Sequence, residues 1–147
     1  MVEVGSVTDR PSVLFLCVHN AGRSQLAAGF MRRLAGDTVD VRSGGSEPAE
    51  QINPAVVEAM REVGIDIASQ VPQRFGEEDV READVVITMG CGDSCPIIPG
   101  RRYEDWDLPD PSGRTLEEIR PIRDQIEHRV VSLVAELAPG RHLPSAT

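Results

Sequence analysis

The most informative part of this chain is SVLFLCVHNAGRS, from Ser12 to Ser24. Its apolar run, Val13 to Cys17, is typical of a strand buried on both faces of a parallel sheet. A short loop follows, and from Ser24 to about Leu34 apolar residues recur at helical spacing. The segment therefore predicts a strand, a tight loop and a helix in direct succession.

The loop of this segment combines a nucleophile with anion-binding groups. Five residues separate Cys17 from Arg23, and a loop of that length can turn its backbone N–H groups toward one tetrahedral oxyanion. Free N–H groups at the start of the predicted helix face the same spot, and their positive field favours a thiolate at Cys17. Arg23 adds a planar fork of donors that suits phosphate or arsenate. The predicted oxyanion-binding residues are Val18, His19, Asn20, Ala21, Gly22, Arg23 and Ser24.

A plainer interpretation of the same residues is that Cys17 is a buried thiol at a strand end, because free cysteine often behaves as a small core hydrophobe. The strand before the loop and the helix directly after it favour the catalytic interpretation, since a motif gains weight when its structural setting is predicted as well. We therefore treat Cys17 as the candidate nucleophile.

The composition points to one small acidic domain. The chain has 147 residues and a formal net charge of −9, which argues against nucleic acid or an anionic membrane as a partner. No apolar run approaches the roughly 20 residues that span a bilayer, and the first residues lack a basic-then-apolar signal. We therefore expect a cytoplasmic protein. In that compartment its three cysteines are more often catalytic, redox-active or metal-binding than disulfide-linked.

Strand-like and helix-like segments alternate along the chain. Strands are expected at 13–17, 38–42, 85–88 and 103–108. Helices are expected at 24–34, 54–63 and from Ile122 onward, with Pro121 starting or kinking the last helix, and 77–83 is expected to be a short helix or a turn. Residues 1–11 are expected to be a flexible extension, 12–138 one α/β domain and 139–147 a flexible tail. The alternation predicts a parallel sheet with helices on both faces, with the loops of Cys17, Ser43 and Cys91 and the Asp110 turn meeting at its carboxyl edge.

These motifs resemble a known family. The loop from Cys17 to Ser24, together with Asp110-Pro111 far downstream, resembles the low-molecular-weight tyrosine phosphatase superfamily, and within it the arsenate reductases that recycle through thioredoxin. The resemblance continues through Asn53-Pro54 to Met60, Val86 to Pro96, and Trp106.

The family implies a four-stranded parallel sheet flanked by helices. It also implies that Asp110 is a general acid, that Asn20 braces the loop and that Ser24 stabilises the thiolate. No metal site is expected. A monovalent cation in particular is not expected, because Ala28 stands where some members carry an acidic ligand for such a cation.

The cysteines suggest how such a protein would handle electrons. Reduction of arsenate to arsenite takes two electrons, which the formation of one disulfide releases, so Cys17 needs a second thiol. Cys91 and Cys95 are four residues apart, and on a helical turn that places their Cα atoms about 6 Å apart, within disulfide range. The predicted relay runs from Cys17 to Cys91 and then Cys95, with no bound cofactor and with thioredoxin, or mycothiol and mycoredoxin, as external reductant. Alternatively, Cys91 and Cys95 are ordinary loop thiols, or they bind zinc with Cys17 and His19.

Two other functions share some of these residues. A protein tyrosine phosphatase uses the same loop and acid but needs an aromatic wall for the phenyl ring, and Asp110-Pro111 is followed by Ser112-Gly113. A non-enzymatic thiol sensor of metalloids would need the cysteines but neither Arg23 nor Asp110. We therefore expect an arsenate reductase, a monomer or weak homodimer, that binds arsenate with phosphate or sulfate as mimics and retains weak phosphatase activity.

Overall fold

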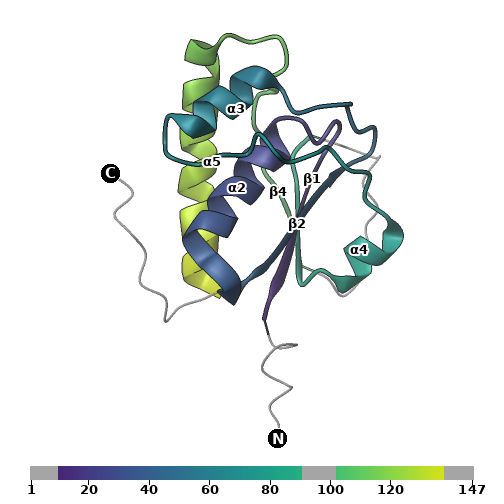
Figure 1. Ribbon diagram of the computed structural model, residues 1–147. Helices are drawn as coiled ribbons and strands as arrows, with labels where there is room; N and C mark the ends of the chain where they lie inside the picture. The colour runs from purple at the N-terminus through teal and green to yellow at the C-terminus, as the bar shows by residue number, and fades with distance from the viewer. Residues whose placement is uncertain (1–9, 91–101, 138–147) are drawn as a thin grey trace, which may run out of the picture.

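Four parallel strands form the single sheet of this protein, as its computed structural model, which describes residues 10–90 and 102–137, shows (Figure 1). The strands are β1 (Ser12–Cys17), β2 (Asp40–Gly45), β3 (Val85–Thr88) and β4 (Arg102–Asp105). Their order across the sheet is β2-β1-β3-β4, so β1 lies between β2 and β3. The predicted α/β fold class is confirmed.

Helices cover both faces of the sheet. They are α2 (Arg23–Ala35), α3 (Pro54–Arg61), α4 (Glu77–Glu82) and α5 (Leu116–Leu137), with a short 3-10 helix η1 (Gly36–Thr38) before β2. Figure 1 shows α2, α3 and α5 on one side of the sheet and α4 on the other. In the part of the chain that the structure describes, no helix is both long and apolar enough to cross a membrane.

The alternation of side chains along β1 explains its uninterrupted apolar sequence. Phe15 and Cys17 belong to the larger core, which α2, α3 and α5 cover. Leu14 and Leu16 face the smaller core, where Val80 of α4 packs. Successive side chains of a strand point to opposite faces, so a central strand covered on both sides needs an apolar residue at every position.

Strand β2 lies further along the chain than its sequence predicts, because it begins at Asp40 and not at Thr38, which belongs to η1. Instead of ending at Arg42 it continues to Gly45, with Phe15 opposite Ser43 and Cys17 opposite Gly45. Segments rich in serine and glycine usually indicate a loop, but here glycine is needed for close packing. A Cβ atom on Gly44 would lie 2.8 Å from the Cβ atom of Phe75.

Helices α2, α3 and α4 lie within two residues of their predicted bounds, whereas β4 and α5 differ more. Strand β4 ends at Asp105 rather than Leu108, and α5 begins at Leu116, six residues before Ile122, with Pro121 inside it. The early start of α5 has a local cause. The backbone N–H of Thr115 donates to Glu118 Oε1 at 2.9 Å, and the N–H of Glu118 donates to Thr115 Oγ1 at 3.2 Å. This reciprocal capping box is readable as Thr-x-x-Glu in the sequence.

Candidate functional site

The loop between β1 and α2 has its carbonyl groups turned outward. Four of these carbonyls accept backbone N–H groups from the segment after β2: Cys17 O from Ser46 at 3.3 Å, Val18 O from Glu47 at 2.8 Å, His19 O from Ala49 at 3.0 Å and Ala21 O from Asn53 at 3.0 Å. Because so many carbonyls point away from the loop centre, the N–H groups of the same peptides are left for the inside. This is the concave arrangement of donors that binds an anion.

Asn20 holds the loop in its curled form. Its φ is 51°, in the left-handed region that asparagine tolerates better than most residues. Its side chain is fully buried, and its Oδ1 accepts the backbone N–H of Gln73 at 2.9 Å. A backbone N–H can only donate, so this bond fixes the orientation of the amide and directs Nδ2 toward Ser24.

Ser24 connects that amide to Cys17, the candidate nucleophile. The Nδ2 group of Asn20 donates to Ser24 Oγ at 2.7 Å, and Ser24 Oγ lies 2.8 Å from Cys17 Sγ. Since the hydroxyl oxygen accepts from Asn20, its own hydrogen is free to point at the sulfur. The chain of contacts from Gln73 through Asn20 and Ser24 therefore ends in a donor aimed at the Cys17 sulfur.

Arg23 and Asp110 lie beside the loop. The guanidinium of Arg23 donates from Nη1 to Leu108 O at 3.2 Å, and its Nη2 is 3.7 Å from Asp110 Oδ2. The Arg23 side chain is 11% exposed and that of Asp110 is 52% exposed, so the arginine is held within the protein and the carboxyl faces solvent. The backbone of Gly90 packs closely against the Arg23 guanidinium, because a Cβ atom on Gly90 would lie only 2.6 Å from Nη1. This close packing restricts the movement of the Arg23 side chain.

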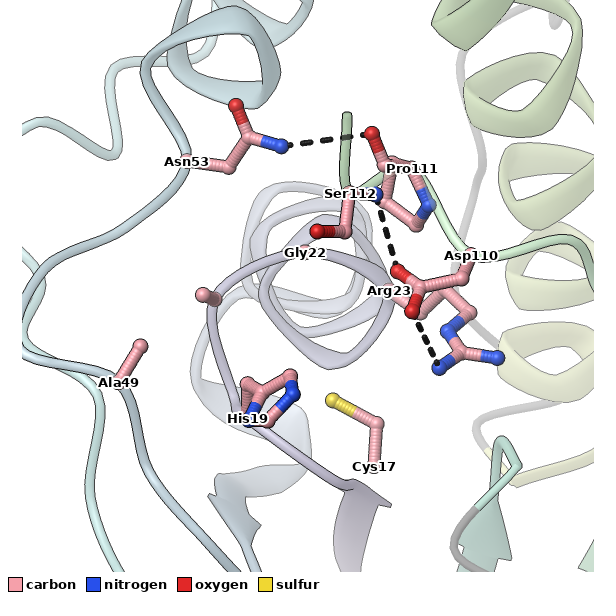
Figure 2. Close-up of a pocket in the computed structure, with 10 residues that line it drawn as sticks. Cys17, His19, Gly22, Arg23, Ala49, Asn53, Asp110, Pro111 and Ser112 are labelled. Atoms are coloured by element: carbon pink, nitrogen blue, oxygen red, sulfur yellow. Dashed lines mark hydrogen bonds and ion pairs between the residues drawn. The ribbon is translucent and has the colours of Figure 1, made fainter. Parts of the chain in front are cut away.

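These groups border one pocket (Figure 2). Cys17 lies at its base, Arg23 and Asp110 lie on one side, and Asn53 lies on the opposite side with Ala49. The residues that line it in the described part of the chain are Cys17, His19, Ala21, Gly22, Arg23, Ala49, Asn53, Asp110, Pro111 and Ser112. No aromatic ring other than the imidazole of His19 is among them, so the pocket offers charge and hydrogen bonds rather than an aromatic wall.

The structure brings together most of the side chains singled out from the sequence. Cys17, Arg23, Asp110 and the loop between Cys17 and Ser24 meet at the carboxyl edge of the sheet, where β1 is flanked by β2 and β3. His19 is exposed at the rim, and its Nδ1 lies 2.9 Å from Glu47 O. Cys91 and Cys95 lie outside the described residues.

Sequence reasoning missed three residues that shape the loop. Gln73 provides the N–H that orients Asn20, Gly45 lets the chain after β2 approach the loop, and Asn53 contacts both the loop and the Asp110 turn. Gln73 carries no sequence signal, because it acts through its backbone. The Gly44-Gly45 pair and Asn53-Pro54 are visible in the sequence, but their partners are distant along the chain.

Comparison with known proteins places this pocket in a family. The model of the low molecular weight phosphotyrosine protein phosphatase family matches residues 12–142. The chain belongs to this family. The match covers the strand, the loop, the helix after it and the Asp110 turn, and it confirms the resemblance noted from the loop.

Several individual relatives within this family are named arsenate reductases. A protein of Staphylococcus haemolyticus named arsenate reductase 2 is 37% identical, over 84% of this chain and 96% of its own length. A protein of Synechocystis sp. named glutaredoxin arsenate reductase is also 37% identical, over 86% of this chain and 98% of its own. The structure of a thioredoxin-dependent arsenate reductase of Corynebacterium glutamicum is similar with a TM-score of 0.77 and 42% identity, over 89% of this chain and 63% of that one.

Proposed function

We propose that this protein reduces arsenate to arsenite. The observation that carries the proposal is the position of Cys17 Sγ at the base of a pocket that Arg23 and Asp110 also line, in a chain whose relatives are named arsenate reductases. Arsenate has the size, charge and tetrahedral oxygens for which a ring of inward N–H groups and one guanidinium are suited.

The first half of the reaction uses the described residues. The Cys17 thiolate attacks arsenic while the loop N–H groups and Arg23 hold the oxygens of arsenate. One As–O bond breaks, and Asp110 protonates the departing oxygen, which leaves as water. The product is a covalent adduct in which the Cys17 sulfur is bonded to arsenic. Ser24 supports this step because its hydroxyl, 2.8 Å from the sulfur, can donate to the thiolate.

The second half needs another thiol. In our proposal Cys91 attacks the Cys17 sulfur, the S–As bond breaks, and its electron pair stays on arsenic, which leaves as arsenite. Cys17 and Cys91 are then joined by a disulfide, which accounts for the two electrons gained by arsenic. Cys95 attacks Cys91 in turn and frees Cys17, and an external thiol reduces the Cys91–Cys95 bond. We propose thioredoxin as that reductant, with mycothiol and mycoredoxin as the alternative, and the cytoplasm as the location.

The pocket lining disfavours a dedicated tyrosine phosphatase. A phenyl ring is held by aromatic side chains, and among the described residues Ala49 and Ser112 stand at the sides of the pocket instead. A thiol sensor of metalloids would not need Arg23 and Asp110 at the same place. We therefore propose reduction of arsenate as the main activity, with weak hydrolysis of aryl phosphates.

The test is arsenite production with one electron donor at a time. Wild type, Cys17→Ser and Cys95→Ser are each assayed with thioredoxin and its reductase, and separately with mycothiol and mycoredoxin. We expect Cys17→Ser to be inactive with both donors and Cys95→Ser to lose thioredoxin-driven turnover while still completing one round. Full thioredoxin-driven turnover by Cys95→Ser would show that the relay is wrong. An absence of arsenite with every donor would refute the proposed function itself.

A further inference from the structure

Asn53 makes hydrogen bonds to three parts of the protein: the oxyanion loop, the start of α3 and the Asp110 turn. Its backbone N–H donates to Ala21 O, in the oxyanion loop, at 3.0 Å. Its side-chain Oδ1 accepts the N–H of Ala55 at 2.9 Å and so caps α3. Its side-chain Nδ2 donates to Pro111 O, next to Asp110, at 3.5 Å (Figure 2). We propose that Asn53 is a positioning residue that holds the Asp110 turn over the oxyanion loop, an inference that rests on the proposed function.

Among the described residues, the Asp110 turn is also held by bonds of its own, by the Arg23–Asp110 ion pair and by packing of Pro111 on the loop. Within the turn, the N–H of Ser112 donates to Asp110 Oδ1 at 3.0 Å, and the N–H of Arg114 donates to Pro111 O at 3.1 Å. Against the loop, the Pro111 ring packs where Gly22 has no side chain, since a Cβ atom there would lie 2.6 Å from Pro111 Cγ. Asn53 adds a second donor on the Pro111 carbonyl, which has two lone pairs.

Charge explains why a neutral contact is needed at this turn. Arg23 attracts Asp110, with Nη2 and Oδ2 3.7 Å apart. A bound oxyanion competes with Asp110 for the same guanidinium, so the contact between Arg23 and Asp110 weakens when the pocket is filled. The bond from Asn53 Nδ2 to Pro111 O carries no net charge and is unaffected by this competition. It therefore keeps the acid near the oxygen that it must protonate.

Two substitutions separate the capping role of Asn53 from the positioning role. Asn53→Ser keeps a good N-cap but removes the side-chain donor to Pro111 O. Asn53→Ala removes both the N-cap and this donor, and the backbone N–H remains in each variant. We expect both variants to lower the rate of the first arsenite-forming turnover roughly fivefold, the factor expected for loss of one neutral hydrogen bond, with the KM for arsenate changed by less than about twofold. We also expect Asn53→Ala alone to lower the unfolding midpoint in urea.

The decisive measurement repeats Asn53→Ser in an Asp110→Asn background. If Asn53 acts through Asp110, the second substitution changes the first-turnover rate little once the acid is gone. An equal loss in both backgrounds would overturn the proposal, as would an unchanged rate in Asn53→Ser itself.

A second readout does not depend on arsenate. Hydrogen exchange of the Ser112 and Arg114 amides, followed by NMR, reports on the Asp110 turn directly and should quicken roughly fivefold in Asn53→Ser. Unchanged exchange would overturn the positioning role even if the protein reduces arsenate. Faster exchange in a protein that produces no arsenite would instead refute the proposed function and leave the contact standing.

Discussion

At the scale of single residues, the shape of the pocket depends on a few positions at which the backbone conformation or the available space admits few side chains. Asn20 adopts a left-handed conformation that few side chains tolerate, and Gly45 lies against the loop backbone. Cys17 and Arg23 could be proposed as site residues from the sequence, because their residue types suit the chemistry, whereas Asp110 was proposed from the family resemblance. The role of Gly45 could not be predicted, because it depends on a contact between two segments that are about 25 residues apart in the chain.

Gly45→Ala is expected to damage the loop. The new Cβ atom would lie 2.5 Å from Val18 O and 2.9 Å from Asn20 N, and both are backbone atoms that cannot rotate away. The loop must therefore shift, and we expect turnover to fall by roughly 100-fold, as displacements of about 1 Å do, with weaker binding of inorganic phosphate in calorimetry. Gly76→Ala is the control, because its nearest contact would be an ordinary 3.6 Å. Activity within twofold of wild type in Gly45→Ala would contradict this account.

At the scale of elements, α3 and α5 are joined by a charged cluster outside the pocket. Glu62, at the end of α3, accepts from Arg120 at 2.6 Å and from Arg123 at 2.8 Å, and Arg123 also donates to Ala59 O at 2.9 Å. Hydrogen bonds from Arg120 and Arg123 lower the pKa of Glu62 from its usual 4.5 to about 2. The helical spacing of α5 was predictable, but its pairing with α3 was not, because sequence periodicity does not say which helices are neighbours.

Glu62→Gln is expected to reduce the loss of unfolding free energy that occurs when the pH is lowered. The folded protein holds the Glu62 carboxylate to a lower pH than the unfolded chain does, so its contribution is complete above about pH 4.5 and is lost as the pH falls toward about 2. Urea unfolding measured across this range should show a smaller decline in the variant than in wild type. Glu58→Gln is the matched control, since Glu58 pairs with Arg61 on the same helix. An identical decline in wild type and Glu62→Gln would rule out this linkage.

At the scale of the whole molecule, the two faces of the sheet are packed against hydrophobic cores of different size. The larger core joins β1, β3, α2, α3 and α5, whereas the smaller one centres on Leu14, Leu16, Val86 and α4. Phe15 is fully buried in the larger core, with its ring centroid 5.9 Å from that of Trp106. We therefore expect the free energy of unfolding to be dominated by the face that carries Phe15.

Phe15→Ala tests this expectation. Removing a fully buried phenyl ring costs about 3–5 kcal/mol, a large part of the total stability of a domain. The loss should appear as a lower urea midpoint with an unchanged slope. Val71→Ala is the control, because Val71 is 62% exposed and should leave the midpoint unchanged. A loss below about 1 kcal/mol in Phe15→Ala would mean that the core around Trp106 can close over the gap.

The amino-acid sequence by itself determined most of the local structure and the candidate reactive thiol, Cys17. The apolar run into Cys17 predicts a strand and the helical spacing after Ser24 predicts a helix, because backbone propensity and side-chain chemistry act over a few residues. The proposed role of Asp110 came from the resemblance of Asp110-Pro111 to the family. The tertiary structure alone decided that Gln73 orients Asn20, that Gly45 supports the loop and that Asn53 reaches Pro111. These contacts join distant segments at the carboxyl edge of β1, where the strand order places β2 on one side and β3 on the other. No local pattern encodes such pairings, because they exist only once the chain is packed.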